Sequence, residues 1–282
     1  MQPLFKLPWP APLREGRLLR RYDRFLVDVM AADDESLVTA HCANSGMMEG
    51  LVRPGARVWL LPSSNARRRL EWTWVMVESD GVMVGVDTLL PNRLARAMLD
   101  ARAVPRVGGY DGVVPEFPHA PGSRVDFRLT LPGGAHDVEV KNCHLVYPDG
   151  RGYFPDSVST RATKHLTLLT REAKRGLKAT VLFVVQREDV KSVRPSDLHD
   201  PDFANAARRA KSAGVNFLAL KARPTLEGVE VLGTVPVDLK PYGTARVESW
   251  REALRPCSGW VRGPRAARVV PGDDGEGAAE AS

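Results

Sequence analysis

Residues 1–89 alternate between apolar and polar positions in short runs, which is the pattern of strands with one buried face. Asp80–Gly81 separates the last two runs, as in a β-hairpin. The runs are Arg17–Met30, Ser36–His41, Arg57–Leu61, Trp72–Glu78 and Val82–Asp87. Several short strands without a long helix predict a small β-barrel in this part of the chain.

The pattern changes after residue 89, where apolar residues recur at helical spacing. One helix is predicted from a cap at Asn92 to about Ala101, and a second from a cap at Thr160 to Gly176. A third helix begins at Asp200–Pro201. The strand-like segments are Tyr110–Phe117, Arg124–Leu131, Asp137–Tyr147, Ala179–Gln186 and Val215–Leu220. This order predicts a mixed α/β sheet over residues 90–239.

Residues 240–282 form a C-terminal extension. From about residue 263 this extension is rich in Gly, Ala, Asp and Glu and has no apolar periodicity, which predicts disorder. The start of the chain lacks the order of a signal peptide, and no apolar run is long enough to span a bilayer. The three cysteines are widely spaced and fit neither a disulfide framework nor a zinc site. We therefore expect a cytoplasmic protein without a membrane partner.

Positive charge is concentrated in the second half of the chain. The net charge of the protein is +6. Residues 1–89 hold 11 basic and 11 acidic residues, whereas residues 90–262 hold 27 basic and 19 acidic residues, a net of +8. A basic excess on one domain indicates a polyanionic partner such as DNA, or alternatively RNA.

Three side chains with useful chemistry fall on two neighbouring predicted strands. By strand alternation, Asp126 takes the face opposite to Val125 and Phe127. On the next strand, Glu139 and Lys141 take the face opposite to the valines. A Pro-Gly-Gly turn joins the two strands, so the strands can be antiparallel neighbours. The two carboxylates and the lysine are therefore predicted to converge.

Such a cluster suits the hydrolysis of a phosphodiester. Asp126 and Glu139 repel each other unless a cation lies between them, and carboxylate oxygens select Mg²⁺ or Mn²⁺. A bound cation of this kind lowers the pKa of water. Lys141 is placed to stabilise developing negative charge. Spacing alone leaves a second interpretation open, because a salt-bridge ladder on the surface of a hairpin has the same pattern.

Seven segments carry a resemblance to a known family. They are Gly16–Leu26, His41–Gly46, Leu90–Leu94, Ser123–Phe127, Val138–Lys141, Phe154–Asp156 and Lys164–Leu166. In this order and spacing they resemble the sugar fermentation stimulation proteins, over about residues 13–239. The Asp126 and Glu139-x-Lys141 pair of strands after a helix is also similar to the core of PD-(D/E)xK nucleases.

The resemblance implies an α+β protein of two domains. Residues 1–89 would form an OB-like β-barrel that binds nucleic acid, and residues 90–239 a mixed α/β PD-(D/E)xK nuclease-like domain. It further implies a bacterial-type protein that binds DNA with little sequence preference and is associated with sugar (maltose) metabolism. Asp126, Glu139 and Lys141 match the catalytic core positions, and Asp126 and Glu139 are the expected ligands of Mg²⁺ or Mn²⁺.

Basic residues form two groups of candidate nucleic-acid contacts. In the barrel they interleave with aromatic residues, which can stack on bases; the alternative is that the aromatics are core and the arginines solubilise the surface. In the second domain they lie on the first turn of a helix, where phosphate binds readily. The candidates are Arg17, Arg20, Arg21, Arg24, Arg67, Arg68, Arg161, Lys164 and His165.

Further carboxylates and two functional interpretations remain open. Glu116 and Asp156 are candidates for additional catalytic groups. The segment His41–Gly46 holds groups that suggest nucleophilic chemistry, but a turn at Asn44–Gly46 is the simpler interpretation. The protein is either a magnesium-dependent nuclease or a non-catalytic DNA-binding regulator of sugar metabolism. Direct sugar binding is a third interpretation, which no motif supports.

Overall fold

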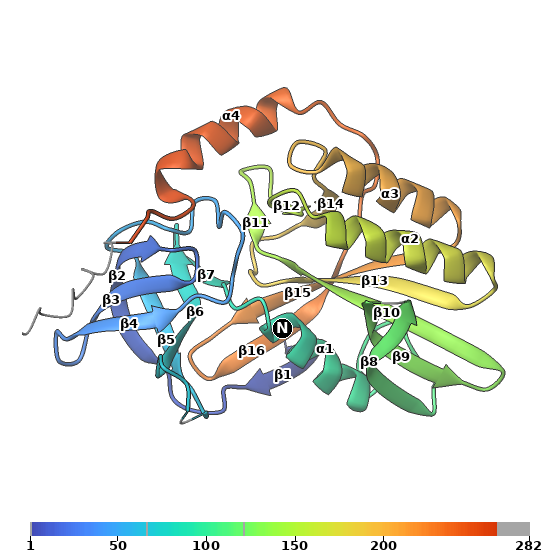
Figure 1. Ribbon diagram of the computed structural model, residues 1–282, viewed down its shortest axis with the longest axis horizontal. Helices are drawn as coiled ribbons and strands as arrows, with labels where there is room; N and C mark the ends of the chain where they lie inside the picture. The colour runs from blue at the N-terminus through green and yellow to red at the C-terminus, as the bar shows by residue number, and fades with distance from the viewer. Residues whose placement is uncertain (1, 66, 121, 264–282) are drawn as a thin grey trace, which may run out of the picture.

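The chain folds into two domains, and its N-terminal and C-terminal segments both run between them. The computed structural model describes residues 2–263 except Ala66 and Pro121. An N-terminal β-barrel lies beside a larger C-terminal α/β domain, and the C-terminal segment runs from the second domain back to the first (Figure 1). The predicted division into a barrel and a mixed α/β domain is confirmed.

The barrel is OB-like, with five strands that close on themselves. Its strands are β2 (Arg14–Tyr22), β3 (Leu26–Ala31), β4 (Leu37–His41), β5 (Arg57–Pro62) and β6 (Trp72–Ser79), and β7 (Val82–Gly85) adds to the edge of β6. The sheet order is β4-β3-β2-β5-β6-β7. A parallel contact between His41 of β4 and Thr73 of β6 closes the barrel.

The interior of the barrel settles part of the question about its aromatic residues. Trp74 is completely buried among aliphatic side chains, and its indole N–H donates to the carbonyl oxygen of Met76 at 2.9 Å. Trp74 is therefore a core residue. Phe25 remains 42% exposed.

A seven-stranded mixed sheet forms the centre of the second domain, in the order β1-β16-β15-β13-β10-β9-β8. The strands are β8 (Gly112–Ala120), β9 (Ser123–Leu131), β10 (Gly134–Cys143), β13 (Lys178–Val185), β15 (Asn216–Pro224), β16 (Gly228–Val235) and β1 (Phe5–Pro8). The neighbours β10, β13 and β15 run parallel, and the other pairs are antiparallel. Predominantly apolar sequence in β13 fits a strand buried on both faces.

The N-terminal strand changes the predicted domain boundary. We expected residues 1–89 to belong to the barrel. Instead, β1 pairs with β16 at the far edge of the second domain's sheet, with Phe5 opposite Val231. Because an exposed sheet edge invites further pairing, the N-terminal strand also protects that edge.

Helices cover both faces of this sheet (Figure 1). Helix α1 (Leu90–Asp100) packs on one face, and α2 (Thr160–Lys174) and α3 (Pro201–Ser212) pack side by side on the other. Asp200 caps α3 as predicted, its side chain accepting from the N–H of Phe203. The predicted cap of α2 is wrong by one residue: the hydroxyl of Ser159, rather than that of Thr160, accepts from the N–H of Ala162.

Asn92 does not cap α1 as predicted. The helix begins two residues earlier, at Leu90, with Pro91 in its first turn. Proline fits this position because the first N–H groups of a helix have no partner within it. The side chain of Asn92 is consequently available for another contact, described below.

A small third sheet lies where the predicted strand Asp137–Tyr147 is interrupted. It contains β11 (Leu145–Val146), β12 (Arg151–Phe154) and β14 (Ser192–Pro195). Tyr147 and Tyr153 pack edge to face beside this sheet, with ring centroids 5.1 Å apart. These residues form part of the junction between the domains.

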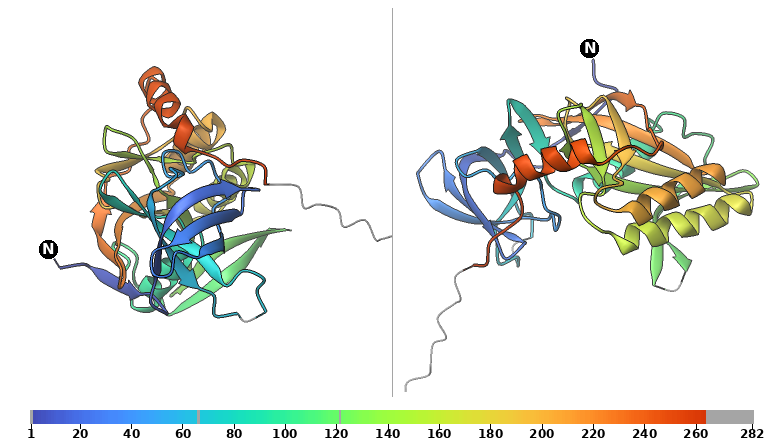
Figure 2. Two further views of the ribbon diagram at one scale, coloured as in Figure 1. Left: turned by 90° about the vertical axis from the view of Figure 1, so that its left-hand side faces the viewer. Right: turned by 90° about the horizontal axis from the view of Figure 1, so that it is seen from above.

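Residues 240–263 form a segment that we call the C-terminal strap. Its helix α4 (Ala245–Leu254) and the 3₁₀ turn η1 (Arg255–Cys257) cross from the second domain to the barrel (Figure 2). The strap ends against β2, where Val261 forms a bridge to Tyr22. Sequence patterns did not predict this structure. The disorder predicted from about residue 263 concerns residues 264–282, which lie outside the described part of the chain.

The domain junction is held by a buried acidic side chain from the barrel. Glu49 accepts from the hydroxyl of Tyr147 at 2.6 Å and lies 2.9 Å from Nε2 of His199. Arg251 of α4 lies 3.2 Å from the same carboxylate. A buried carboxylate with these partners ties together the barrel, the α/β domain and the strap. Within the described residues, no helix is both long and apolar enough to cross a membrane.

Arg21 fastens the strap to the barrel and generates a first prediction. Its guanidinium is buried and donates to the carbonyl oxygens of Arg24, Asn44, Gly46 and Gly259. Lysine cannot reproduce this planar set of donors. Arg21→Lys should lower the free energy of unfolding by about 2–4 kcal/mol, because carbonyl groups lose their partners.

The matched control is Arg20→Lys on the same strand, where the side chain is about half exposed and pairs with Asp28. This change should alter the free energy of unfolding by no more than about 0.5 kcal/mol in urea denaturation. Equal effects of the two substitutions would show that the buried arginine has no special role in stability.

Candidate active site

The pairing of β9 with β10 stops at the predicted cluster. The last pair in the register is Val138 opposite Phe127, and one further step would set Glu139 opposite Asp126. At that point the Oδ2 atom of Asp126 accepts a hydrogen bond from the backbone N–H of Val140 at 2.7 Å. A side-chain carboxylate thus takes the place of a backbone acceptor, and the ladder between the two strands opens.

This opening explains why the prediction for the buried face of β9 is wrong. We expected Val125 and Phe127 on the same side of the strand. Val125 instead packs in the core under α2 and α3, and Phe127 packs in the core on the α1 side. Regular alternation ends at Asp126, where β9 leaves the β10 ladder while it stays paired with β8. The predicted placement of Val138 and Val140 on one face is confirmed.

Asp126 is held from a second direction by α1. Its Oδ1 atom accepts from the side-chain amide of Asn92 at 3.0 Å. Burial raises the pKa of Asp126, the neighbouring charge of Glu139 raises it further, and the resulting value is about 6. The carboxylate is therefore expensive to ionise in the absence of a cation. Sequence reasoning missed Asn92, because asparagine near a helix start is also typical of a cap.

Glu139 is buried and makes polar contacts with two other side chains. It is 2% exposed, and its Oε1 atom lies 2.5 Å from Nζ of Lys141. Nδ1 of His165, from α2, also contacts this oxygen. Burial alone would raise the pKa of Glu139, but Lys141 and His165 outweigh it and lower the pKa. The predicted convergence of Asp126, Glu139 and Lys141 is therefore present, and His165 belongs to the cluster.

The donor set of this cluster fits a hard divalent cation only in part. Among the residues described by the structure, no group of three or more His, Cys, Asp or Glu side chains is arranged to hold a metal. Two carboxylates are present, and each carboxylate oxygen has two lone pairs, so Asp126 and Glu139 keep acceptor capacity beyond their present partners. Magnesium commonly retains several waters and uses one or two carboxylates. Asp126 and Glu139 are thus the residues that would hold such an ion.

Asp156 lies at the junction between the two domains and makes contacts on both sides of it. It lies 3.5 Å from Nε2 of His144 and accepts from the N–H of Met48 in the barrel. Burial would raise its pKa, but the contact with His144 outweighs burial and lowers the pKa to about 2. A β-carbon on Gly46 would lie 2.3 Å from the carboxylate, so only glycine fits there. The hydrogen bond from the N–H of Gly46 to the Asn44 side chain supports the turn interpretation of this loop.

Glu116 lies outside the cluster. Its side chain is exposed and lies 3.8 Å from Arg124. Both residues line an open hollow of about 800 Å³, together with Arg161. Among the described residues, no recorded hydrogen bond or ion pair joins Glu116 to Asp126 or Glu139.

The candidate nucleic-acid contacts have diverse surroundings. Arg21 is buried, so it belongs to the fold and has no surface for phosphate. His165 is buried against Glu139, whereas Arg161 and Lys164 are exposed on the same end of α2. The barrel residues that remain at least partly exposed are Arg17, Arg20, Arg24, Arg67 and Arg68.

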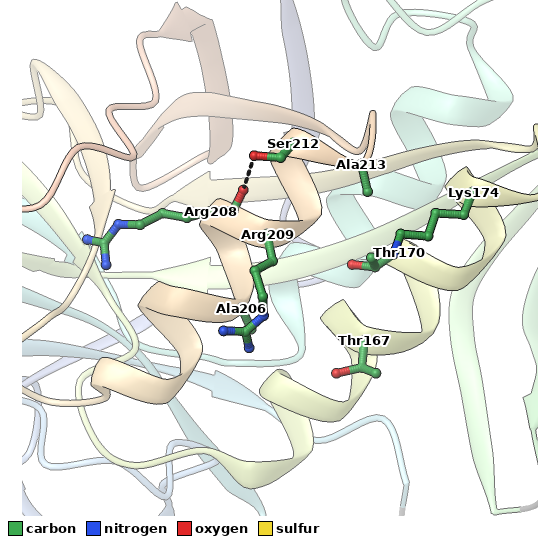
Figure 3. A pocket seen from close by; sticks show the side chains of 8 residues that line it. All are labelled: Thr167, Thr170, Lys174, Ala206, Arg208, Arg209, Ser212 and Ala213. Carbon is green, nitrogen blue, oxygen red and sulfur yellow. Dashed lines mark hydrogen bonds between the residues drawn. The ribbon is translucent and has the colours of Figure 1, made fainter.

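A further hollow of about 550 Å³ lies between α2 and α3 (Figure 3). Its walls include Thr170 and Lys174 from α2 and Arg209 from α3, and none of the carboxylate cluster lines it. Lys174 and Arg209 lie in the last turns of their helices, where cations compensate the negative end of the helix dipole. This hollow is therefore explained by the fold.

The raised pKa of Asp126 generates a stability prediction. An acid whose pKa is higher in the folded than in the unfolded protein destabilises the fold as pH rises, here from about 4 to about 6. A change from 3.8 to about 6 corresponds to at most about 3 kcal/mol. Asp126→Asn should therefore be more stable than the wild type at pH 7.5 without metal.

The gain should become small near pH 4 and vanish below about pH 3, where the wild-type carboxyl is protonated in both states. Thermal unfolding of both proteins in EDTA across this pH range measures the difference. A difference that does not change with pH would rule out ionisation of Asp126 as its cause.

Comparison with known proteins agrees with this architecture. The family model for the sugar fermentation stimulation protein RE domain matches residues 89–228, and the model for the SfsA N-terminal OB domain matches residues 19–86. A sugar fermentation stimulation protein homolog of Geobacter sulfurreducens is 44% identical over 228 residues, covering 81% of this chain and 97% of the relative. The homolog of Jannaschia sp. is 42% identical over 236 residues, covering 83% of this chain and 98% of the relative.

A solved structure shows the same fold. The structure of Pyrococcus furiosus SfsA in complex with Ca²⁺ has a TM-score of 0.75 and 22% identity, covering 84% of this chain and all of that chain. The sequence resemblance and the predicted fold, an OB-like barrel followed by an α/β domain, are thereby confirmed. The chain belongs to the sugar fermentation stimulation protein family.

Proposed function

We propose that this protein is a divalent-metal-dependent nuclease that cuts DNA and that its catalytic residues are Asp126, Glu139 and Lys141. One observation carries the proposal. The chain opens a strand ladder to bring two carboxylates together, and the pKa of one of them is about 6. An ion pair that only stabilises the fold requires one carboxylate, and burying a second carboxylate beside it costs free energy. Perturbed carboxyl groups of this kind are typical of functional sites.

Each side chain has a distinct task in this proposal. A bound Mg²⁺ or Mn²⁺ would supply an activated water and polarise the phosphate. Asp126 and Glu139 would hold that ion, with Asn92 and the N–H of Val140 fixing the orientation of Asp126. Lys141 would stabilise charge that develops on the phosphate oxygens.

His165 orients Glu139 by contacting the same oxygen as Lys141. A carboxylate fixed by two partners loses little freedom when a cation binds, so the site is preorganised. His165 is therefore a positioning residue, although the sequence had indicated a nucleic-acid contact for it.

The charge distribution favours a nucleic acid as substrate. The excess of +8 lies in residues 90–262, the part of the chain that contains the cluster. Arg161 and Lys164 are exposed at the N-terminal end of α2, one turn before His165 and directly before it, respectively. Cations at a helix N-terminus are well placed to bind phosphate. The relative from Pyrococcus furiosus was solved in complex with Ca²⁺, which supports a site for a hard divalent cation.

A non-catalytic DNA-binding regulator of sugar metabolism is the second candidate. The names of the relatives refer to the stimulation of sugar fermentation and so support its link to sugar metabolism. One contact also favours it, because Lys141 and His165 already compensate the charge of Glu139. In that case the cluster would be a polar anchor for α2, and nucleic acid would bind without being cut.

Cleavage assays separate the two candidates. Purified protein should cut single- or double-stranded DNA with Mg²⁺ or Mn²⁺ and should not cut it in EDTA. Asp126→Asn and Glu139→Gln should abolish cleavage, and Lys141→Met should slow it on the order of 100-fold, as expected for loss of one charge-stabilising donor. Glu116→Gln is the matched control, since this exposed carboxylate lies outside the cluster.

The control should cut like the wild type. Cleavage that persists in Glu139→Gln would place the activity elsewhere or in a contaminant. An absence of cleavage by wild-type protein on DNA and RNA, with DNA binding intact, would favour the regulator.

A further inference from the structure

We propose that the barrel binds a single nucleic-acid strand along a row of flat side chains and leads it to the carboxylate cluster. We call this set the stacking row; it consists of Trp260, Arg24, Phe25 and His41. The inference rests on the nuclease proposed above, and it adds the form of the substrate and the path that the substrate takes.

The members of the stacking row contact one another in sequence. The guanidinium carbon of Arg24 lies 5.1 Å from the ring centroid of Trp260 and 5.9 Å from that of Phe25. The rings of Phe25 and His41 are parallel within 10°, with centroids 6.4 Å apart. Phe25 is 42% exposed and Trp260 is 37% exposed. Aromatic rings and guanidinium planes of this kind offer stacking surfaces to unpaired bases.

The backbone at Arg24 makes a direct test of its side chain possible. Arg24 has φ of +66° and its neighbour Asp23 has φ of +45°, in the tight turn between β2 and β3. Left-handed backbone costs a residue with a β-carbon on the order of 1 kcal/mol, and glycine avoids this cost. Glycine at position 24 would relieve this strain, so the arginine side chain can be removed without cost to the backbone.

The row ends at a hollow between the two domains. His41 lines this hollow, which has a volume of about 330 Å³, together with apolar residues such as Pro10 and Pro62 and the charged residues Asp87 and Arg93. Nδ1 of His41 is buried without a hydrogen-bond partner among the described residues. This volume is at the lower end of the range for small-ligand pockets and suits one nucleoside.

The hollow adjoins the carboxylate cluster through one turn of α1. Arg93 contacts Asp87 in the hollow at 2.7 Å, and the preceding residue, Asn92, donates to Asp126 at 3.0 Å. Consecutive residues of a helix point about 100° apart, so the two contacts leave the same turn of α1 in different directions. The path that we propose for the strand beyond the hollow follows this turn of α1 toward Asp126 and Glu139.

Charge and shape favour a single strand over a duplex. The barrel region is neutral, with 11 basic and 11 acidic residues in 1–89, so it lacks the charge excess of a surface that grips phosphates. In single-strand binding, stacking side chains act together with a basic track for the backbone, and stacking needs free base faces, which a duplex hides. The basic second domain then provides the phosphate contacts that the barrel lacks.

The test is fluorescence anisotropy with a labelled 12-nucleotide oligo-dT and the full chain carrying Glu139→Gln, in EDTA. Under these conditions binding is measured without any cleavage. Arg24→Gly keeps the carbonyl that accepts from Arg21 and relieves the left-handed backbone, so this variant should fold at least as well as its parent. Phe25→Ala removes one exposed ring.

Each variant should weaken oligo-dT binding roughly 10-fold, as expected for loss of a stacking partner. The matched controls are Arg106→Gly, an exposed arginine with φ of +63° in the second domain, and Leu19→Ala, a 40% exposed side chain elsewhere on the barrel. Both controls should bind within about 2-fold of the parent. Replacing central thymidines by abasic sites should also weaken binding to the parent, whereas a 12-base-pair duplex should bind more weakly than oligo-dT.

Several results would overturn the stacking row: equal binding by Phe25→Ala and Leu19→Ala, no effect of abasic sites, or tighter binding of the duplex. An oligo-U arm shows whether the row accepts RNA as well as DNA. Cleavage in the Glu139 wild-type background is scored separately. If the wild type cuts DNA but the substitutions in the stacking row leave oligo-dT binding unchanged, only this inference is contradicted. If these substitutions weaken binding but the wild type cuts no nucleic acid, only the proposed nuclease is contradicted.

Discussion

The carboxylate of Asp126 is the point on which the site depends, because it replaces a backbone acceptor for the N–H of Val140. This bond ends the β9–β10 ladder while still satisfying a buried amide. Asp126 then meets Glu139 across the opening, and Asn92 fixes it from α1. A helix, two strands and, through His165, a second helix are thereby brought to one point. The high pKa of Asp126 is the consequence of that arrangement.

The second constraint is the tight junction between the two domains, which fixes the barrel relative to the site. Gly46 lies so close to Asp156 that no β-carbon fits, and Glu49 is buried against Tyr147 and His199. The N-terminal strand and the C-terminal strap each connect the domains again. A nucleic acid held on the barrel would consequently meet the cluster in a constant geometry.

Sequence pattern predicted the barrel, the mixed sheet and the convergence of Asp126, Glu139 and Lys141, because alternation and turn residues report directly on strands. It failed where side chains replace backbone partners. Asn92 resembles a cap, yet it bonds to Asp126, and the interruption at Asp126 moved Val125 to the other core. The joining of distant segments, such as β1 with β16, leaves no local signal at all.

The central claim is that Asp126 and Glu139 together hold a divalent cation, and calorimetry tests it most directly. Manganese is titrated into metal-free wild type, Glu139→Gln and the control Glu116→Gln at pH 7.5, where Asp126, with a pKa of about 6, is ionised. The account predicts binding heat for the wild type and the control, and none for Glu139→Gln. Equal heats for the wild type and Glu139→Gln would contradict it.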